Sequence, residues 1–463
     1  MCGIVGIAGQ QDPDWIRHMN SSIVHRGPDD GGEYVSRESS VSMSMRRLSI
    51  IDIQGGHQPM PNKDRSLWVV FNGEIYNAPE IRRRMEQRGE QFLTGHSDTE
   101  VLLHLYEEKG FSCLDDLNGM FAFVIHDRKQ NLLFGARDRM GIKPLYYCSA
   151  NGRFLFASEL KALLTVPIIE REIDRQSLYH YMTLLYVPDE ASIIKGVRRI
   201  PPAHSFVYDL KSRQLTLQKY WQLKFAGDES LDEKEWAEVL RDELKAAVRR
   251  WTLSDVPIAC SLSGGLDPSA IVGLLAETGY PRTKTYSLGF VGEEEQSWNE
   301  IDLARQVAQR WGTDHHEILL EPQDLLSELV AMVWHLDEPY GGGLPSWYVF
   351  REMSRDVKVG LTGTGGDELF GNYGKFRIYE ANRILQAALA SRRCSGKAAR
   401  MLAGLIAPLS TLSNSLPSSW PWIGRGHLLS QLPRMINEPF GRYYYANFEY
   451  FSDECKRTEV LRT

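Results

Sequence analysis

The second half of the sequence alternates apolar strands with helices, and this pattern constrains the fold more than any other feature. It begins with the strand VPIACSL, the Gly-rich turn SGGLDPS, the helix AIVGLLAE and the strand TYSLGF. A helix near 300–311, the strand HEILL, helices over 322–355 and the strand VKVGLTG continue it. Strands that alternate with helices form a parallel sheet covered on both faces. We therefore predict a doubly wound α/β domain.

The first half has a different pattern, in which short β runs are separated by turn residues. These runs are YVSRESSVSMSM, SLWVVFNGEIYN, MFAFVIHD, NLLFGAR and GRFLFAS. The stretches PEIRRRMEQRG and DTEVLLHLYEEKG have helical patterns. We predict an α+β sandwich of antiparallel sheets, so the chain as a whole is α/β. The acidic stretch GDESLDEKEW should open a helix after a domain boundary, which gives domains at 2–212 and 236–463.

The charge of the chain argues against nucleic acid as a partner. The 463 residues include 53 Lys and Arg and 60 Asp and Glu, for a net charge of -7. Such a balance supplies no large basic field for a phosphate backbone. Any nucleotide must therefore be held by local groups.

Neither the N-terminus nor the cysteines suggest an extracellular or membrane protein. MCGIVGIAGQQ has no basic region followed by a long apolar run, and we expect no membrane partner. The cysteines have no C-x-x-C spacing and predict neither a disulfide scaffold nor a zinc site. They are Cys2, Cys113, Cys148, Cys260, Cys394 and Cys455. The sequence thus favours a reducing, cytoplasmic location.

Two Gly-rich loops follow apolar strands of the predicted parallel sheet. In SGGLDPS, the serine and glycines allow close approach of the backbone to a phosphate, although for SGG alone an ordinary turn between strand and helix is the favoured interpretation. The loop LTGTGGDELFGNY repeats the arrangement. Asp267 and Asp367 could then share Mg²⁺ with a polyphosphate. Because the sequence has no G-x-x-x-x-G-K-[ST] signature, cleavage between the α and β phosphates of ATP is favoured.

The motifs together resemble the glutamine-hydrolysing asparagine synthetases. The loop SGGLDPS is similar to the pyrophosphate loop of ATP pyrophosphatases. The first half resembles class II glutamine amidotransferases through MCGIVGIAG, HRGPDD, RLSIID, FNGEIYN, SDTEV, NGMFAF, RDRMGIKPLYY and FASELKAL. The resemblance implies a sandwich of the N-terminal-nucleophile type followed by an ATP-pyrophosphatase domain.

For the first domain, the resemblance implies that Met1 is removed and that the Cys2 thiolate attacks glutamine, with its own α-amine as base. It assigns Arg47 to the glutamine carboxylate and Asp98 to its ammonium. The oxyanion hole would be Asn72 and Gly73. The full implied glutamine set is Arg47, Leu48, Ser49, Ile50, Ile51, Asn72, Gly73, Glu74 and Asp98. Without the motifs, Cys2 would be read as a small buried cysteine.

For the second domain, the resemblance implies ATP as substrate and Mg²⁺ bound by Asp267 and Asp367. The implied ATP set is Leu262, Ser263, Gly264, Gly265, Asp267, Ser269, Leu288, Thr362 and Gly363. A carboxylate would be activated as its acyl-adenylate, and ammonia arriving through an internal passage would displace AMP. With aspartate as the acceptor, the products are asparagine, glutamate, AMP and pyrophosphate.

Four features depart from the family pattern. Pro268 replaces a serine of the pyrophosphate loop, Thr364 stands where these enzymes carry Asp or Glu, and DEPYGGGLPSW is short and Gly-rich. The chain also ends at LRT, before the family's C-terminal helical segment, so we expect the ligase domain to be incomplete.

These departures leave two alternatives open. One is a paralogue that amidates another carboxylate, such as a uronic acid or a natural-product precursor. The other is a non-ligating sensor of glutamine or ATP. In each case the expected partners are small molecules, and a homodimer is allowed for.

Overall fold

The computed structural model describes residues 1–371, apart from 11–12, 189, 227–229, 281, 293–298, 322–326 and 341–343. Met1–Tyr181 and Leu185–Gly363 form one compact unit, and Met182–Leu184 with Thr364–Thr463 form a second. Cys394, Cys455 and the glycines of DEPYGGG therefore lie outside the described residues. Within the described part, no helix is both long and apolar enough to cross a membrane.

Two six-stranded antiparallel sheets form the first half of the chain. In spatial order, one contains β10 (Arg198–Arg199), β8 (Tyr146–Ala150), β9 (Arg153–Ala157), β1 (Gly3–Ala8), β3 (Val41–Arg47) and β2 (Asp30–Ser36). The other contains β12 (Leu215–Lys219), β11 (His204–Asp209), β7 (Leu132–Arg137), β6 (Gly119–Asp127), β5 (Leu67–Ile75) and β4 (Met60–Pro61).

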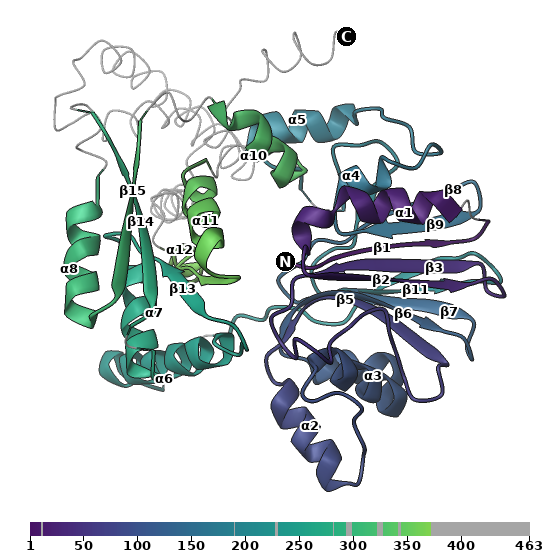
Figure 1. The fold of residues 1–463 in the computed structure, drawn as a ribbon, viewed down its shortest axis with the longest axis horizontal. Coiled ribbons are helices and arrows are strands. Elements are labelled where there is room, and N and C mark those ends of the chain that lie inside the picture. Colours follow the sequence, from purple (N-terminus) through teal and green to yellow (C-terminus); the bar gives the residue numbers. More distant parts are fainter. Residues whose placement is uncertain are drawn as a thin grey trace, which may run out of the picture. The chain divides into compact units, whose positions relative to one another are not determined.

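Helices cover the outer faces of both sheets, so the first half has four layers (Figure 1). Helices α1 (Pro13–Ser22) and α4 (Leu160–Leu163) pack on the β1 sheet, and α2 (Ala78–Gln87) and α3 (Asp98–Lys109) cover the β5 sheet. Strand β1 is buried on both sides. Ile4 points into the core between the sheets and Val5 into the core under α1, as the two-residue period of a strand requires. The predicted antiparallel sandwich is confirmed.

A four-stranded parallel sheet forms the second half, in the order β15 (Asp314–Leu320), β14 (Lys284–Phe290), β13 (Ile258–Ser261) and β16 (Val359–Leu361). Ile258 and Cys260 share a core with helices on one face, whereas Ala259 and Tyr286 pack against a helix on the other. The helices on the first face are α6 (Glu233–Trp251), α7 (Leu266–Glu277) and α8 (Ile301–Trp311), and α11 (Leu344–Asp356) lies on the second. The predicted doubly wound sheet is confirmed.

The remaining helical elements are short. They are η1 (Val24–Arg26), η2 (Gly110–Asp115), α5 (Arg175–Leu184), α10 (Leu329–Leu336) and α12 (Gly366–Phe370). The predicted opening of a helix by the acidic stretch is also observed, because Asp232 and Glu235 form a reciprocal capping box at the start of α6.

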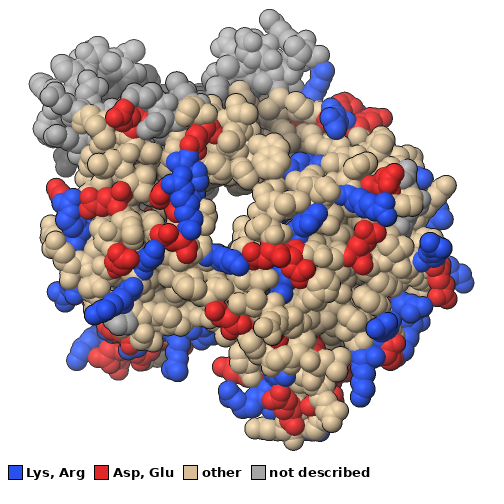
Figure 2. Space-filling view, in the orientation of Figure 1, with Lys and Arg blue, Asp and Glu red and all other residues tan. Residues whose placement is uncertain are grey.

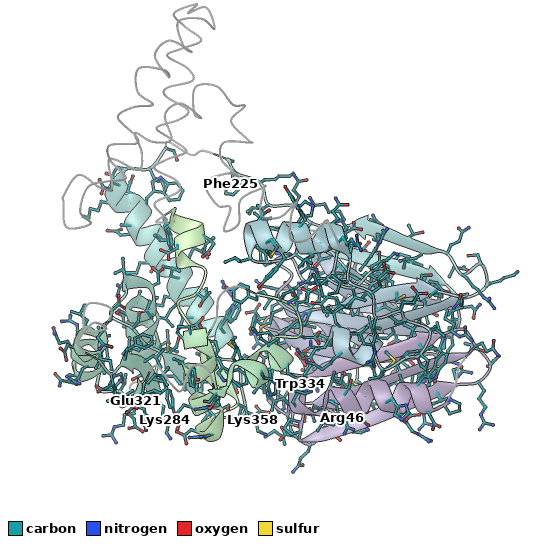
Figure 3. All side chains as sticks on the ribbon, turned by 90° about the horizontal axis from the view of Figure 1, so that it is seen from above. Arg46, Phe225, Lys284, Glu321, Trp334 and Lys358 are labelled. Atoms are coloured by element: carbon teal, nitrogen blue, oxygen red, sulfur yellow. The ribbon has the colours of Figure 1, made fainter. Side chains whose placement is uncertain are left out.

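The surface carries both signs of charge. On the face shown in Figure 2, Lys and Arg lie beside Asp and Glu. Lys284, labelled in Figure 3, pairs with Asp356 at 2.9 Å. Phe225, in the segment between β12 and α6, is 92% exposed (Figure 3).

Candidate active site

Cys2 lies directly before β1, and two side chains of the same sandwich fix its backbone. Arg26 donates from Nε to the Cys2 carbonyl at 2.8 Å and from Nη1 to the Glu159 carboxylate at 2.8 Å. The Cys2 thiol lies 3.7 Å from the carbonyl oxygen of Leu48, to which it donates. A buried ion pair thus holds the residue that the sequence proposes as nucleophile.

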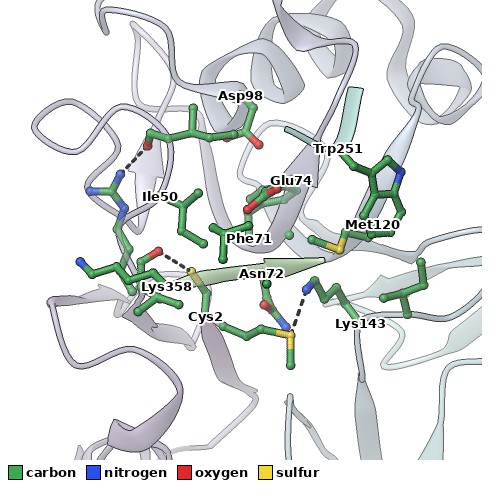
Figure 4. Close-up of a pocket in the computed structure, with 18 of the residues that line it drawn as sticks. Cys2, Ile50, Phe71, Asn72, Glu74, Asp98, Met120, Lys143, Trp251 and Lys358 are labelled. Carbon is green, nitrogen blue, oxygen red and sulfur yellow. Dashed lines mark hydrogen bonds between the residues drawn. The ribbon is translucent and has the colours of Figure 1, made fainter. Parts of the chain in front are cut away.

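A cavity of about 590 Å³ opens beside this thiol (Figure 4). The predicted glutamine-site residues that line it are Cys2, Arg47, Leu48, Ile50, Ile51, Asn72, Gly73, Glu74 and Asp98. Ser49 is not among the lining residues: it is buried, and its N–H donates to the Asp29 carboxylate at 2.8 Å. The cavity has the volume of an ordinary small-molecule site.

Arg47, at the end of β3, is held by the loop that follows it. Its guanidinium donates to the carbonyl oxygens of Ile53 at 3.0 Å, Ile51 at 2.9 Å and Asp52 at 2.7 Å. A guanidinium has five N–H groups. These bonds use both N–H groups of Nη2 and one of Nη1, so one N–H of Nη1 and the N–H of Nε remain for an anion such as a carboxylate.

Asn72 is 1% exposed, and neither atom of its amide has a hydrogen-bond partner within the described protein. Leaving buried polar atoms unpaired costs roughly 1–3 kcal/mol each, so such groups call for an explanation. Its neighbour Gly73 must lack a side chain, since a Cβ there would lie 2.2 Å from the carbonyl oxygen of Met120. The Asn72 amide can donate to an oxyanion that forms beside Cys2.

Two buried carboxylates face the same cavity. Burial and the nearby Asp98 together raise the pKa of Glu74 to about 7, against the lowering effect of Lys143. Burial also raises the pKa of Asp98 to about 6, although the Ile75 N–H donates to it at 3.0 Å. A cationic group bound between them would favour their ionised forms.

Met1 is present beside the thiol. Burial raises the pKa of the Cys2 thiol, against the lowering effect of the neighbouring amine. Burial also lowers the pKa of the Met1 amino group to about 5. With Met1 attached, the thiol is therefore protonated. The α-amine beside it belongs to Met1, whereas the predicted base is the α-amine of Cys2.

The two Gly-rich loops follow neighbouring strands of the parallel sheet. β13 and β16 pair directly, and SGGLDPS and the loop containing Thr362 and Gly363 begin where these strands end. A Cβ on Gly363 would lie 2.5 Å from the backbone N of Pro268, so the loops touch. Thr362 also lines the cavity that contains Cys2.

Comparison with known proteins identifies the family. Residues 1–221 match the glutamine amidotransferase domain model, and residues 239–438 match the asparagine synthase model. Asparagine synthetase [glutamine-hydrolyzing] 1 of Bacillus subtilis is 38% identical over 81% of this chain and 60% of its own length. The putative asparagine synthetase [glutamine-hydrolyzing] 2 of Methanocaldococcus jannaschii is 35% identical over 81% of this chain and 76% of its own length. The chain belongs to the glutamine-hydrolysing asparagine synthetase family.

The chain thus spans about 60% of the length of the first of these relatives. Among solved structures, the glutamine phosphoribosylpyrophosphate amidotransferase of B. subtilis is similar with a TM-score of 0.38 and 15% identity, over 70% of this chain and 92% of that one. The fold assignment itself rests on the strands and helices described above.

The residues predicted to bind ATP lie in and around these two loops. Leu262 is buried and donates its N–H to the Tyr286 carbonyl at 2.8 Å, and Leu288 lies on β14. Within the loop, the Ser263 hydroxyl accepts from the Gly265 N–H at 3.1 Å. Ser269 donates its hydroxyl to the Gly265 carbonyl at 2.7 Å, so this hydroxyl is engaged within helix α7. Gly264 packs against the side chain of helix α8 residue Leu303.

The two expected Mg²⁺ ligands lie in different units. Asp267 is in the first turn of α7, and Asp367 is in the first turn of α12, which belongs to the second unit. No group of three or more His, Cys, Asp or Glu side chains suited to a metal occurs among the described residues. The shared Mg²⁺ site therefore stays a prediction.

Two residues at this site were not singled out in the sequence analysis, although both lie in motifs quoted there. Arg26 of HRGPDD holds the Cys2 carbonyl, and Lys143 of RDRMGIKPLYY lines the cavity. Charge alone gives no reason to choose them, since Arg and Lys are seldom buried. Only the motif spacing could have singled them out.

Asp337 and Glu338 of DEPYGGG are both engaged. Asp337 accepts from the backbone N–H groups of Leu160 and Lys161 at the start of α4. Glu338 pairs with Arg199 at 3.2 Å. Both oxygens of Asp337 are therefore engaged, whereas the buried Oε1 of Glu338 has no hydrogen-bond partner among the described residues.

Proposed function

We propose that this chain is a glutamine-dependent amide ligase that hydrolyses glutamine at Cys2 and delivers the ammonia to an adenylated carboxylate. The observation that carries the proposal is the buried Asn72 amide, which has no hydrogen-bond partner among the described residues and lines the same cavity as Cys2, Arg47 and Asp98. Arg47 and Asp98 supply opposite charges for the two ends of an amino acid. The amide supplies a donor for the oxyanion.

In the proposed first reaction, Met1 has been removed, and the Cys2 α-amine takes the thiol proton as the sulfur attacks the glutamine carboxamide. The oxyanion accepts hydrogen bonds from the Asn72 amide and the Gly73 N–H. Collapse of this intermediate transfers the proton to the leaving nitrogen and releases ammonia. Water then hydrolyses the γ-glutamyl thioester to glutamate and restores the thiol.

In the proposed second reaction, an acceptor carboxylate attacks the α-phosphate of ATP and releases pyrophosphate. The loop from Ser263 to Ser269 and the N-terminus of α7 would hold the phosphates through backbone N–H groups. Leu262, Leu288, Thr362 and Gly363 would contact the rest of the nucleotide. Pro268 has no N–H to offer, which costs this loop at most one phosphate contact.

Mg²⁺ suits the carboxylates proposed for it. Proteins commonly hold Mg²⁺ with one or two carboxylates and leave other positions to water and substrate phosphates, so Asp267 and Asp367 are a sufficient pair. The ion would neutralise the polyphosphate when bound. The contact between Gly363 and the first turn of α7 supports a common phosphate site for both loops.

The proposed ammonia route is the cavity itself. Thr362 of the nucleotide loop and Cys2 line the same cavity, so this cavity connects the two proposed reaction sites. A short route between them is useful because only unprotonated ammonia is a nucleophile.

Aspartate is the proposed acceptor, and the proposed domains are residues 2–212 and 236–463. Thr364 favours a second candidate, amidation of a different carboxylate, because these enzymes usually carry an acid there. A sensor that binds ATP without cleaving it is the third reading.

The proposal is tested by measuring glutamate, AMP and pyrophosphate formed from glutamine and ATP, with aspartate present or omitted. AMP release that depends on aspartate, with asparagine formed, is the expected result. If glutamine is hydrolysed but AMP is released only when a carboxylate other than aspartate is added, the second candidate is correct. If ATP binds but no AMP is released with any carboxylate tested, the result would support the sensor.

The Cys2→Ala variant isolates the first reaction. It should abolish glutamine hydrolysis and retain amide formation from added ammonia. Intact-mass measurement of the wild-type protein checks that Met1 is removed. Glutaminase activity that survives in Cys2→Ala would refute the assignment of the nucleophile.

A further inference from the structure

Lys143 is buried in the glutaminase pocket without a role in the reaction proposed above. It is 4% exposed and, among the residues that the structure describes, the only buried lysine. Burying an ammonium is costly unless an opposite charge or strong acceptors compensate. A buried lysine beside a nucleophile therefore needs a reason.

The backbone around Lys143 is rigidly held. The Asp138 carboxylate, 1% exposed, accepts from the N–H groups of Ile142 at 2.9 Å and Lys143 at 3.0 Å. Arg137 donates from Nε to the Lys143 carbonyl at 2.8 Å and from Nη2 to the Gly141 carbonyl at 2.6 Å. The loop after β7 thus fixes where the ammonium enters the pocket.

Inside the pocket, the ammonium meets Met1. Its Nζ lies 3.0 Å from the Met1 thioether sulfur, and Figure 4 shows the side chain pointing into the space that Cys2, Asn72 and Glu74 border. A thioether is a weak acceptor. Removal of Met1 takes this sulfur away and brings the free α-amine of Cys2 into the same space.

We propose that Lys143 is a positioning residue of the glutaminase. Once Met1 is removed, its ammonium pairs with the Glu74 carboxylate and, by its positive charge, favours the neutral form of the Cys2 α-amine. This inference rests on the proposed function of Cys2. It adds a residue that tunes the base without contacting glutamine.

The electrostatics of the pocket agree with the geometry. Burial lowers the pKa of Lys143 to about 8, which Glu74 opposes and Arg26 reinforces. In turn, Lys143 lowers the pKa of Glu74, of the Cys2 thiol and of the terminal amine. Asp138 and Asp98 also carry negative charge near this group, and Arg47 adds a positive charge near Cys2. Lys143 is thus a cation that acts on the terminal amine of Met1, on the Cys2 thiol and on Glu74.

The test uses the full chain with Met1 removed, as wild type and as Lys143→Met, Lys143→Gln and Lys143→Arg. The matched control is Lys129→Met, because Lys129 is an exposed lysine paired with Asp64 on the same sandwich. Two quantities are followed against pH: kcat/KM for glutamine hydrolysis and the rate of alkylation of Cys2 by iodoacetamide. Thermal unfolding shows which variants fold.

The neutral variants should move the acid limb of kcat/KM upward by about one pH unit, the effect expected for a lost charge a few ångströms away. The alkylation profile should move with it. Lys143→Arg should restore most of both profiles, and Lys129→Met should leave them unchanged. If one neutral variant fails to fold, the other and Lys143→Arg still give the comparison.

Unshifted profiles in folded neutral variants would overturn the inference, even where kcat falls, because that pattern belongs to a purely structural lysine. The alkylation profile needs no turnover. Absence of glutaminase activity in the wild type would therefore count against the proposed function, while the effect of Lys143 on Cys2 would still be read from alkylation.

Discussion

At the scale of single residues, Asn72 is a side chain whose loss should reduce activity without reducing stability. Both of its polar atoms are buried without a partner in the described part of the chain, so Asn72→Ala removes no hydrogen bond seen there. We expect kcat for glutamine hydrolysis to fall about 10²–10³-fold, as when an oxyanion-hole donor is lost. The free energy of unfolding should change little. Steady-state kinetics and urea denaturation measure the two quantities.

The control for this prediction is Asn77→Ala on the same sandwich. Asn77 donates to the Asp116 carbonyl at 2.8 Å and accepts from the Asn118 N–H at 2.9 Å. Its loss should destabilise the protein by about 1–3 kcal/mol, since it strands two backbone groups. A large loss of stability in Asn72→Ala, matching the control, would contradict the unpaired state of Asn72.

Glu74 should make the protein less stable as pH rises. Its pKa is raised by burial from 4.5 to about 7 in the folded state. Between these values the folded state binds more protons than the unfolded state, so the free energy of unfolding falls with increasing pH. Glu74→Gln removes this contribution. We therefore compare the free energy of unfolding of the variant with that of the wild type at each pH. The difference, variant minus wild type, should be larger above pH 7 than below pH 4.5.

Urea denaturation at the two ends of that range checks this prediction. The pKa of Asp98 is also raised, so the free energy of unfolding of the variant should still fall with pH, but less steeply than that of the wild type. Glu38→Gln is the surface control, because the Glu38 side chain is 81% exposed. Parallel pH profiles for wild type and Glu74→Gln would refute the buried, proton-binding state of Glu74.

Residue identities could be predicted here where a motif links them to chemistry. Cys2, Arg47, Asn72 and Asp98 were all expected, and all line one cavity. Their roles stay predictions. Apart from its place in a motif, nothing in the sequence distinguishes Lys143, because its role depends on burial, and burial results from contacts distant in the chain.

At the scale of elements, the contact between the two Gly-rich loops depends on one glycine. A Cβ at Gly363 would lie 2.5 Å from the Pro268 N and 2.8 Å from the Asp267 carbonyl carbon, which are backbone atoms that cannot rotate away. Gly363→Ala should therefore push the loops apart. We expect ATP binding to weaken by about 1–3 kcal/mol, the usual cost of overpacking.

Calorimetric titration with ATP measures this effect. The glutaminase reaction of the same variant is an internal control, and its kcat/KM should stay at the wild-type value. ATP affinity equal to that of the wild type would show that the loops do not form one phosphate site.

The sequence predicted which segments form helices and strands, but it did not predict which strands lie next to each other in a sheet. The strand and helix alternation after Val256 predicted the parallel sheet correctly. Strand β1, GIVGIA, lacks polar alternation because both of its faces are buried, which makes its position at the centre of a sheet a tertiary property. Likewise, the pairing of β13 with β16 joins segments about a hundred residues apart. No local pattern encodes such a register.

At the scale of the whole molecule, the hydrophobic cores divide along the chain. The three buried clusters of the sandwich draw on residues up to Tyr220, and the two clusters of the parallel sheet begin at Leu244. In the described part of the chain, no cluster mixes the two sets. Cooperative unfolding follows shared cores, so each half should unfold as its own unit.

Calorimetry should therefore resolve two unfolding transitions, each moved by a different ligand. In Cys2→Ala, which should bind glutamine without consuming it, glutamine should raise the transition of the sandwich alone, and ATP should raise the transition of the parallel-sheet half alone. At a ligand concentration of about 100 times Kd, the stabilisation is about 2.7 kcal/mol. One transition that both ligands shift together would mean that the halves unfold as a unit despite their separate cores. Two transitions with the predicted ligand pattern would show that each half unfolds with its own hydrophobic core.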